Sequence, residues 1–382
     1  MKKFYEDLKA LLDDNKAAAV ATIIESKGAT PREVGAKMII LDEGQMLGTV
    51  GGGCGEAQVL WDAVRVLRQG PPMISRVDLT GEINDLSPTN CGGIMDVFID
   101  RFRPDEEKGV GLTARETVAK LTEAATKGTP AVLATVVGGY ARRLPLGSKA
   151  LILADGTVHG FPETDPLRPI LVAKAQEALG RGESWRVGLE LPDVSRGQAT
   201  ADEPALDVYL EVMTLPPQLV IVGAGHIAVP LAKIGKLLDF EVTVLDDRSA
   251  FANPQRFPEA DHVIAANIEK TLMDFPVTPN AYFVLVTRGH QLDEEACRCI
   301  LGKGAAYIGM IGSRRRTREV KRHLIEQGYN QALTDEIYAP IGLDLGAETP
   351  GEIAVAIAAE LVNLRRGGRV VPLSRKGKEG AA

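Results

Sequence analysis

The stretch GTVGGGCGEA, residues 48–57, combines a run of glycines with a single thiol. Without Cβ atoms, the backbone N–H groups of this run can approach a ligand closely. We expect a helix to begin near Glu56, and the amides at a helix N-terminus favour anions. The same electrostatics would lower the pKa of the Cys54 thiol and make it a nucleophile or a soft-metal ligand. The alternative is a buried cysteine beside a tight turn. The glycines of the run are Gly51, Gly52 and Gly53.

A second glycine–cysteine loop lies in NCGGIMDVF, which begins at Asn90. It places Cys91 and Gly92 before a predicted strand, in an arrangement similar to that of the first loop. If the two loops are neighbours, both thiols face one cavity, and Cys54 and Cys91 become candidate metal ligands. The sequence has no CxxC pair and no histidine close to either cysteine, which argues against a tetrahedral zinc site. Arg32 would add a cation for an anionic ligand, although an ordinary surface arginine explains it equally well.

These loops lie in a repeat that fills the first half of the chain. From Lys3 to Arg103 we expect the order helix, strand, strand, helix, strand, strand, and the same order returns from Ala114 to Leu215. The segment GAKMIILDEGQMLG (35–48) aligns without gaps with GSKALILADGTVHG (147–160), at an offset of 147 − 35 = 112. We therefore predict two copies of one αββαββ-like unit.

The repeat serves as an internal control, because residues that only one copy carries are not required by the shared fold. Glycines that both copies share are expected to form backbone turns; they are Gly35 and Gly147, and Gly44 and Gly156. Three loops of the first copy have no such counterpart. SKGATPRE (26–33) becomes GGYARRLP, GGGCGE (51–56) becomes FPETDP, and TNCGG (89–93) becomes ADEPA (201–205). We predict that the first copy carries the chemistry and that the second is its structural partner.

The second half of the chain has the pattern of a dinucleotide-binding fold. The segment LVIVGAGHIAVPLAKIGKLLDFEVTVLDDR (219–248) has the order strand, glycine turn, helix, strand and acidic end. Its turn carries Gly223-x-Gly225-x-x-Ala228. Asp246 lies 246 − 223 = 23 residues after Gly223, where a ribose-binding acid belongs, and it would favour NAD over NADP. Alternatively, the glycines only let helix and strand pack, and the nucleotide site is unused.

Ligands of such sheets bind beyond the carboxyl ends of the strands. By that rule the candidate residues, besides Asp246, are Gly223, Gly225, His226, Thr287, Arg288, His290, Ser313, Arg314, Arg315 and Arg316. Ser313 can instead cap the next helix, with the arginines after it on a solvated helix face. His290 could be an acid, a base or a ligand, although a loop histidine often has none of these roles. Cys297 and Cys299 are expected to pack.

The last helix has a recognisable start, with Thr349 as cap, Pro350 in first position and Glu352 completing a capping box. The expected fold class is α/β. An N-terminal α+β region of two similar αββαββ-like units precedes a C-terminal Rossmann-like domain with a doubly wound parallel sheet. We set the domain boundaries at 1–103, 104–215 and 216–366, followed by a basic tail at 367–382.

Composition limits the function classes. Lys and Arg number 44 against 51 Asp and Glu, a net charge of −7 that is unfavourable for a general nucleic-acid binder. No apolar run approaches the roughly 18 residues of a membrane-spanning helix. The first sixteen residues carry charges throughout, unlike a signal peptide, and only four cysteines are present. We therefore expect reduced thiols and a cytoplasmic location.

Together these motifs resemble the xanthine dehydrogenase accessory factors, the XdhC/CoxI-like family. The resemblance rests on GATPREVGAKMII, GTVGGGCGEA, CGGIMDVFID, VGAGHIAVPLAKIGKLLDFEVTVLDDR, YIGMIGSRRRT and IYAPIGLDLGAETPGEIAVAIAAELV, in the family's order. It implies a molybdenum-cofactor chaperone that binds a molybdopterin-type cofactor and presents it for sulfuration by a cysteine desulfurase. The chaperone then delivers the cofactor to an apo-molybdenum hydroxylase. The resemblance also makes a homodimer plausible.

A molybdenum cofactor carries an oxo or sulfido metal and a phosphate, so it needs backbone donors, a soft thiolate and a cation. The resemblance then implies that Cys54 or Cys91 ligates molybdenum or holds sulfur, while the Rossmann cleft takes the pterin or nucleotide end. Two other functions stay open. One is an NAD-dependent oxidoreductase with the first half as substrate domain and His290 as proton donor. The other is a catalytically silent assembly factor, against which retained cofactor would count.

Overall fold

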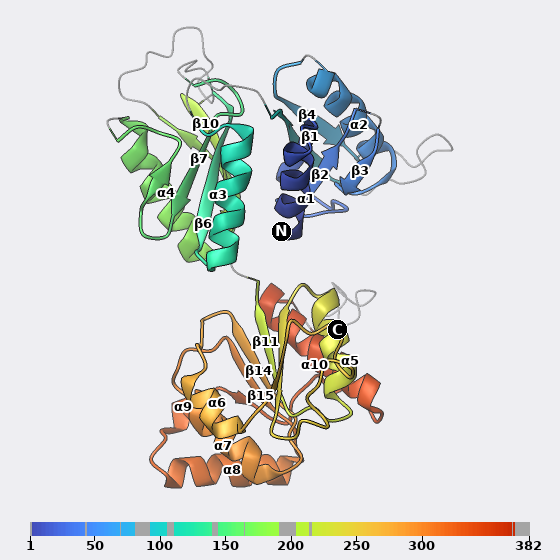
Figure 1. Ribbon diagram of the computed structural model, residues 1–382, viewed down its shortest axis with the longest axis vertical. Coiled ribbons are helices and arrows are strands. Elements are labelled where there is room, and N and C mark those ends of the chain that lie inside the picture. The colour runs from blue at the N-terminus through green and yellow to red at the C-terminus, as the bar shows by residue number, and fades with distance from the viewer. Residues whose placement is uncertain are drawn as a thin grey trace, which may run out of the picture. The chain divides into compact units, whose positions relative to one another are not determined.

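The computed structural model describes residues 2–42, 44–68, 70–80, 92–104, 111–139, 144–163, 165–190, 204–213, 216–368 and 370 (Figure 1). The chain forms two compact units, residues 1–215 and 216–382. Among the described residues, no helix is both long and apolar enough to cross a membrane.

The N-terminal unit contains two repeats with the same order of elements. The first consists of α1 (Lys2–Asp13), β1 (Ala18–Lys27), β2 (Lys37–Ile40), β3 (Met46–Gly48), α2 (Gly53–Arg68), β4 (Met73–Asp78) and β5 (Ile94–Phe102). The second consists of α3 (Ala114–Lys127), β6 (Ala131–Gly138), β7 (Lys149–Leu153), β8 (Val158–His159), α4 (Leu167–Arg181), β9 (Trp185–Leu189) and β10 (Leu206–Met213). The predicted αββαββ order is thus extended by one short strand in each repeat.

Each repeat folds into a five-stranded antiparallel sheet with the same strand order. The first sheet runs β3-β2-β1-β5-β4 and the second β8-β7-β6-β10-β9. The extra strand follows a tight turn at the shared glycine, Gly44 with φ of 76° or Gly156 with φ of 86°. Glycine adopts this left-handed conformation without steric cost, so its predicted role in the backbone turn is confirmed.

The two faces of each sheet in the N-terminal unit pack against different elements. Helix α2 packs on one face of the first sheet, and α4 packs on one face of the second. The opposite faces share a core to which α1 and α3 both contribute (Figure 1). Alternation along β1 produces this division, because Ala19, Ala21 and Ile23 face α2 whereas Ala18 and Val20 face the shared core.

Two buried ion pairs join the repeats reciprocally. Lys37 of β2 lies 2.9 Å from the Glu211 carboxylate of β10, and Lys149 of β7 pairs with Asp100 of β5. Lys37 and Lys149 occupy equivalent positions in the aligned segments, as do the acids Asp100 and Glu211 in MDVFIDRF (95–102) and LDVYLEVM (206–213). Tyr5 also donates to Glu211, at 2.9 Å. Burial, and then the neighbouring carboxylate, raises the pKa of the Tyr5 hydroxyl.

The C-terminal unit is a Rossmann domain. Its strands are β11 (Gln218–Val222), β12 (Glu241–Asp246), β13 (His262–Ala265), β14 (Ala281–Leu285), β15 (Tyr307–Met310) and β16 (Ile337–Tyr338). They form one parallel sheet in the order β13-β12-β11-β14-β15-β16. The helices are α5 (Ala228–Leu237), α6 (Ile268–Asp274), α7 (His290–Ile300), α8 (Arg314–Glu326), α9 (Gln331–Asp335) and α10 (Pro350–Arg366).

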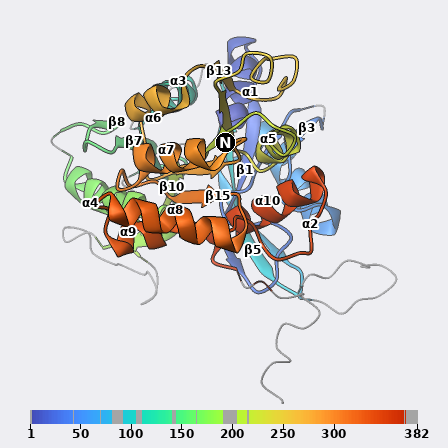
Figure 2. The same cartoon turned by 90° about the horizontal axis from the view of Figure 1, so that it is seen from below.

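Helices cover both faces of the Rossmann sheet. Helices α5 and α10 pack side by side on one face, and α6, α7 and α8 pack on the other (Figure 2). Cys297 and Cys299 of α7 are buried in the second layer, as predicted. The capping box of α10 forms between Thr349 and Glu352, and Ser313 caps α8.

Candidate functional site

Three loops meet at one end of the first sheet, and they are the loops whose sequences the second repeat does not share. A Cβ at Gly51 would lie 2.3 Å from Cγ of Pro31, so the loop before α2 packs directly on the loop after β1. A Cβ at Gly93 would lie 2.4 Å from the carbonyl oxygen of Ala29, so the loop before β5 packs there too. The central loop, residues 26–33, therefore contacts both of the others.

The N-terminus of α2 binds a carboxylate of its own chain. The Glu56 carboxylate accepts hydrogen bonds from the Thr49 hydroxyl at 2.5 Å, the Gly52 amide at 3.1 Å and the Val50 amide at 3.3 Å. Burial by itself would raise the pKa of the Glu56 carboxyl, but these hydrogen bonds hold it below its usual value. An incoming anion therefore reaches the Val50 and Gly52 amides only by displacing Glu56.

The sequence indicated Glu56 only as the start of a helix. An acidic residue in the first turn of a helix is favoured by the backbone amides there, and this signal could have predicted the contact of Glu56 with the amides. What the sequence does not give is the path of the loop, in which Thr49 also accepts from the Gly51 amide at 3.0 Å. That path turns the hydroxyl and the amides toward one carboxylate.

The predicted ligands differ in how far the structure describes them. The backbone of Cys54 lies in the first turn of α2, but its side chain is outside the description, as is the whole of Cys91. Gly52 and Gly92 have φ angles of 76° and 77°, and no atom lies within 4 Å of a Cβ built at either position. Arg32 is exposed, and no charged partner is found for it in the described part of the chain.

A metal site is not visible in what can be described. No group of three or more His, Cys, Asp or Glu side chains that could hold a metal ion occurs among the described residues. Because the thiols of Cys54 and Cys91 fall outside them, their assignment as metal ligands stays a prediction.

Arg186 of the second repeat joins the bases of two of these loops. Its guanidinium lies 3.2 Å from Glu25, directly before the loop at 26–33, and 3.3 Å from Asp96, near the start of β5. It also binds Asp207 of its own repeat, at 2.5 Å. The equivalent residue of the first repeat, Arg76, lies 3.9 Å from Asp96 and no ion pair with the second repeat is found for it among the described residues. The second repeat thus supports the loops of the first.

A cavity of about 410 Å³ adjoins this arginine. It lies between the end of β1 and β9, hence between the two repeats. Its lining residues are Ile24, Glu25, Ser26, Val34, Ser184, Trp185, Arg186, Gly188 and Asp207. The pairing with Asp207 raises the pKa of Arg186 despite partial burial, so the guanidinium stays charged.

The predicted ribose acid of the Rossmann domain is already engaged. Asp246 is buried, and its carboxylate accepts from the Ala224 amide at 2.8 Å and from both Nε and Nη2 of Arg248 at 2.9 Å. Burial opposes ionisation, but these bonds lower the pKa of Asp246 to about 2. A ribose hydroxyl would have to replace one of these donors.

The glycines of the Rossmann turn have separate explanations. A Cβ at Gly223, where φ is 106°, would lie 2.5 Å from the carbonyl oxygen of Val286, so close packing alone requires glycine. No atom lies within 4 Å of a Cβ built at Gly225, so the space beside it is open. His226 is exposed in the turn that follows.

The remaining candidates at the strand ends are mostly bound to neighbours. Arg288 forms two 2.8 Å hydrogen bonds with the Asp247 carboxylate, and the Thr287 hydroxyl donates to buried Asp293 at 2.6 Å. Arg316 lies 3.4 Å from the same Asp293. Ser313 serves as the helix cap of α8, and the side chains of Arg314 and Arg315 are exposed. The side chain of His290 lies outside the described residues.

Comparison with known proteins gives two family matches. The model of the XdhC Rossmann domain matches residues 219–361, and that of the XdhC and CoxI family matches residues 11–78 and 124–188, one segment in each repeat. A protein of Bacillus subtilis described as a probable xanthine dehydrogenase subunit is 27% identical over 376 residues, which cover 96% of this chain and 98% of that protein.

Two further relatives match less. The uncharacterized protein YqeB of Escherichia coli is 23% identical over 96% of this chain, which spans only 46% of YqeB. The molybdenum cofactor insertion chaperone PaoD of Escherichia coli is 34% identical over 59 residues, 15% of this chain and 19% of PaoD. A crystal structure of a xanthine dehydrogenase from Bacillus halodurans has a TM-score of 0.73 and 24% identity, covering 97% of this chain and 98% of the other. That likeness confirms the predicted fold.

Proposed function

Because the chain belongs to the XdhC and CoxI family, we propose that it is an accessory protein for a molybdenum hydroxylase of the xanthine dehydrogenase or CO dehydrogenase type. In this proposal it binds the molybdenum cofactor, presents it for sulfuration by a cysteine desulfurase and passes it to the apo-hydroxylase. Two relatives support the assignment. One is named for xanthine dehydrogenase, and the other, which matches over 59 residues, is named as a molybdenum cofactor insertion chaperone.

The observation that carries this proposal is the meeting of the three loops at the first turn of α2. Their donor set suits a molybdopterin-type cofactor, since it combines backbone amides, the exposed Arg32 and the position of Cys54. The open space beside Gly52 and Gly92 would let a ligand approach the backbone. When bound, the cofactor supplies the oxo or sulfido molybdenum centre.

Each residue then has a separate task in holding that group. We assign Arg32 to an anionic oxygen, and Cys54 or Cys91 to the metal or to a transferred sulfur. The Glu56 carboxylate holds the amides of Val50 and Gly52 while no anion is bound there. A phosphate or oxo group that competes for these amides must therefore displace an intramolecular carboxylate, which weakens its binding and favours its release.

The decisive experiment measures bound cofactor. The full chain is purified from cells that make molybdenum cofactor, and molybdenum and pterin per chain are measured for the wild type, Cys54→Ala and Cys91→Ala. Cys299→Ala, a core cysteine of α7, is the matched control. We expect near-stoichiometric cofactor in the wild type and the control, and its loss on removal of at least one loop thiol. Cofactor retained in both loop variants would refute the role of the thiols.

An NAD-dependent oxidoreductase is the alternative, and the parallel strand order of the Rossmann domain favours it. The engagement of Asp246 with Arg248 and Ala224 weighs against it, because no free carboxylate at that position is left for a ribose. NAD quantified in the same samples distinguishes the two. Bound NAD without pterin would replace the chaperone proposal.

A further inference from the structure

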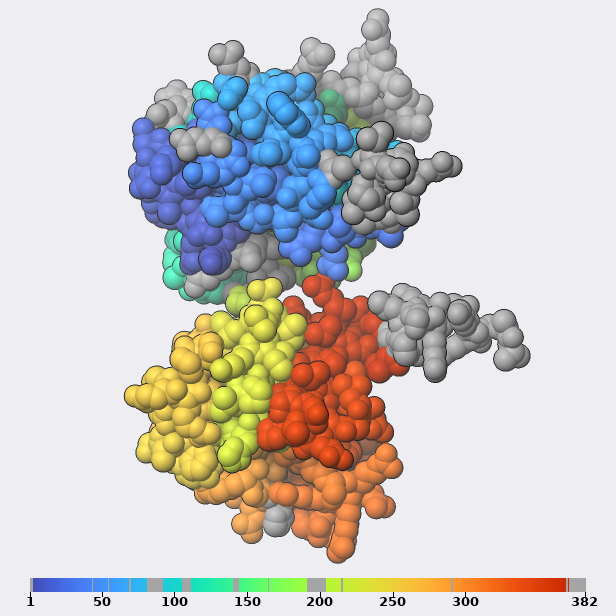
Figure 3. Space-filling view, turned by 90° about the vertical axis from the view of Figure 1, so that its right-hand side faces the viewer, coloured from blue at the N-terminus to red at the C-terminus, as the bar shows by residue number. Residues whose placement is uncertain are grey.

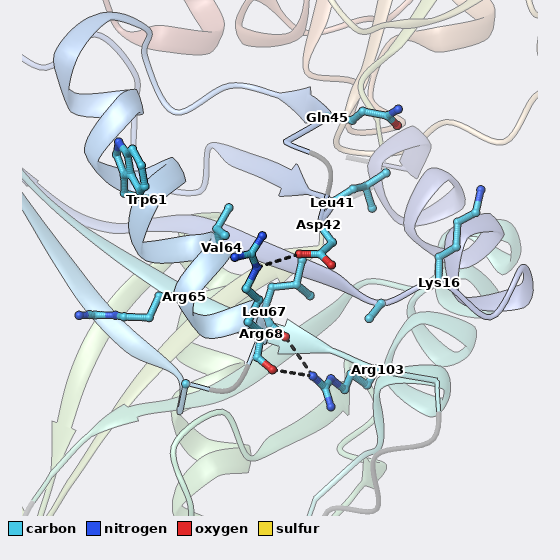
Figure 4. A pocket seen from close by; sticks show the side chains of 12 residues that line it. Lys16, Leu41, Asp42, Gln45, Trp61, Val64, Arg65, Leu67, Arg68 and Arg103 are labelled. Carbon is cyan, nitrogen blue, oxygen red and sulfur yellow. Dashed lines mark hydrogen bonds and ion pairs between the residues drawn. The ribbon is translucent and has the colours of Figure 1, made fainter.

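Figure 4 shows a groove of about 1380 Å³ in the first repeat. Its lining residues include those that precede β1 and those that follow β2, so it lies at the other end of the first sheet from the three loops. Helix α2 begins at the loops with Gly53 and ends in the groove with Arg68, which is about 24 Å at 1.5 Å per residue. A ligand held at the loops therefore does not fill the groove. Its walls come from the second half of α2, from the residues just before β1 and from the turn after β2.

The lining is cationic. Among the residues that the structure describes, its charged lining side chains are the basic Lys16, Arg65, Arg68 and Arg103 and the acidic Asp42. Arg103 is held in place because its Nη2 donates to the carbonyl oxygens of Leu67 and Arg68, both at 3.1 Å, at the end of α2. The other three basic side chains each have an acidic neighbour. Arg68 lies 3.2 Å from Asp42, Arg65 lies 3.4 Å from Asp62, and Lys16 lies 3.9 Å from Asp14. The pairs of Arg68 with Asp42 and of Lys16 with Asp14 are solvent-exposed and weak, and the Arg65 side chain is itself 66% exposed, so the cations remain able to exchange partners.

A large aromatic side chain stands beside these cations. Trp61 is 80% exposed, and Arg65 and Arg68 follow it on the same face of α2 at helical spacing. Tryptophan and arginine are among the residue types that contribute most of the binding energy in protein interfaces. The face on which these residues lie belongs to the first repeat, which forms most of the surface seen in the upper half of Figure 3.

The second repeat shows that the fold does not require these residues. At the offset of 112, the positions of Trp61, Arg65 and Arg68 on α2 correspond to Ala173, Glu177 and Gly180 on α4. Ala173 and Gly180 are exposed as well, so the same helix face exists in both repeats. In α4 this face has lost the aromatic group and exchanged a cation for an acid.

We propose that this groove docks an acidic segment of a partner protein, which places carboxylates against Arg65, Arg68 and Arg103 and an apolar side chain against Trp61. Charge complementarity selects an acidic occupant, because the described lining holds four basic side chains and one acid, and the carboxylates that pair with Lys16 and Arg65 lie outside it. The aromatic anchor selects a protein segment over a small inorganic anion, which has no apolar surface to bury on Trp61. The site is distinct from the loops at which cofactor binding is proposed, so it stands whether or not that proposal holds.

The test uses three labelled dodecapeptides, in which fluorescence anisotropy measures binding to the full chain. The first alternates glutamates with leucine and phenylalanine, the second replaces its glutamates by lysine, and the third replaces its apolar residues by serine. The protein variants are Trp61→Ala and the double charge reversal Arg65→Glu with Arg68→Glu. Arg181→Glu, an exposed arginine on α4, is the matched control. All sites are exposed, so the variants should fold, and thermal melting checks this.

We expect saturable binding of the first peptide alone, weakened at high salt. The double reversal should lower its affinity at least about tenfold, Trp61→Ala about tenfold or more, and Arg181→Glu less than about twofold. Equal binding of the lysine peptide, no saturable binding, or binding unchanged in both groove variants would overturn the proposal. Sedimentation velocity tests whether a second copy of this chain occupies the groove. A dimer that dissociates in the Trp61→Ala variant would show this and would also overturn the proposal.

Discussion

The two repeats of the N-terminal unit share one fold and differ in almost everything that can contact a ligand. Sheet order, turn glycines and the reciprocal pairs of Lys37 and Lys149 are the same in both. The glycine–cysteine loops, Trp61 and the groove arginines are present in the first repeat alone. A duplicated scaffold therefore separates residues that hold the structure from residues that are free to acquire a function.

The largest expected effect comes from breaking what the repeats share. Lys149→Ala removes the ammonium group that pairs with buried Asp100, and removing one partner of such a pair costs about 3–5 kcal/mol. Urea unfolding should show this loss in the free energy of unfolding. Lys120→Ala, which removes an exposed pair with Glu123, should change it by less than about 0.5 kcal/mol. Equal effects of the two variants would show that the buried pair does not hold the repeats together.

A smaller loss should follow from a change in the loops whose glycine-rich sequence only the first repeat has. Gly51→Ala places a methyl group 2.3 Å from Cγ of Pro31 at a φ of 136°, which should cost about 2–4 kcal/mol through overpacking and backbone strain. Gly52→Ala meets no atom within 4 Å and has only the strain of a φ of 76°, so it should cost about 1–2 kcal/mol. Thermal melts of the two variants give the order. Gly52→Ala as the more damaging change would contradict the contact between the loops.

The support that the second repeat gives to the first can be tested at its arginine. Arg186→Gln removes charged hydrogen bonds to Glu25 and Asp96, each worth about 1.5–3 kcal/mol before solvent screening. Hydrogen exchange should then speed up in residues 26–33 and 92–96. Arg76→Gln, in the equivalent position, should leave this exchange nearly unchanged because its pair with Asp96 is 3.9 Å long and the Arg76 side chain is exposed. Similar hydrogen-exchange rates in the Arg186→Gln and Arg76→Gln variants would contradict the idea that only the second repeat supports the loops of the other.

The smallest effect concerns the pH dependence of the loop before α2. Because the folded pKa of Glu56 lies below its usual value, its contribution is complete above the unfolded pKa of 4.5 and is lost as pH falls through the folded pKa. Melts of the wild type and Glu56→Gln should differ at neutral pH and converge in acid. A difference that persists unchanged at low pH would show that the carboxylate is not held by these amides.

Several features were predictable because they depend on neighbours in the sequence. Periodicity predicted the helices and strands of both repeats, and the third strand was missed because β3 and β8 have only three and two residues. The caps at Ser313 and Thr349 follow from side chains within one turn of the helix. The site loops were selected by comparison of the two copies, and their contacts through Pro31 and Ala29 were not predictable, because the loops lie far apart in the chain.

The sequence by itself determined the repeat, the Rossmann pattern and the family, since these depend on residue order and local conformational preference. Only the tertiary structure decided which charged side chains form ion pairs or hydrogen bonds within the chain. Lys37 meets Glu211 and Arg186 meets Glu25 only where the sheets of the two repeats face each other. Glu56 and Asp246 are held by backbone amides whose direction depends on the folded loop. Such partners are chosen by distance and burial in the folded chain, and a pattern of residue types does not contain either quantity.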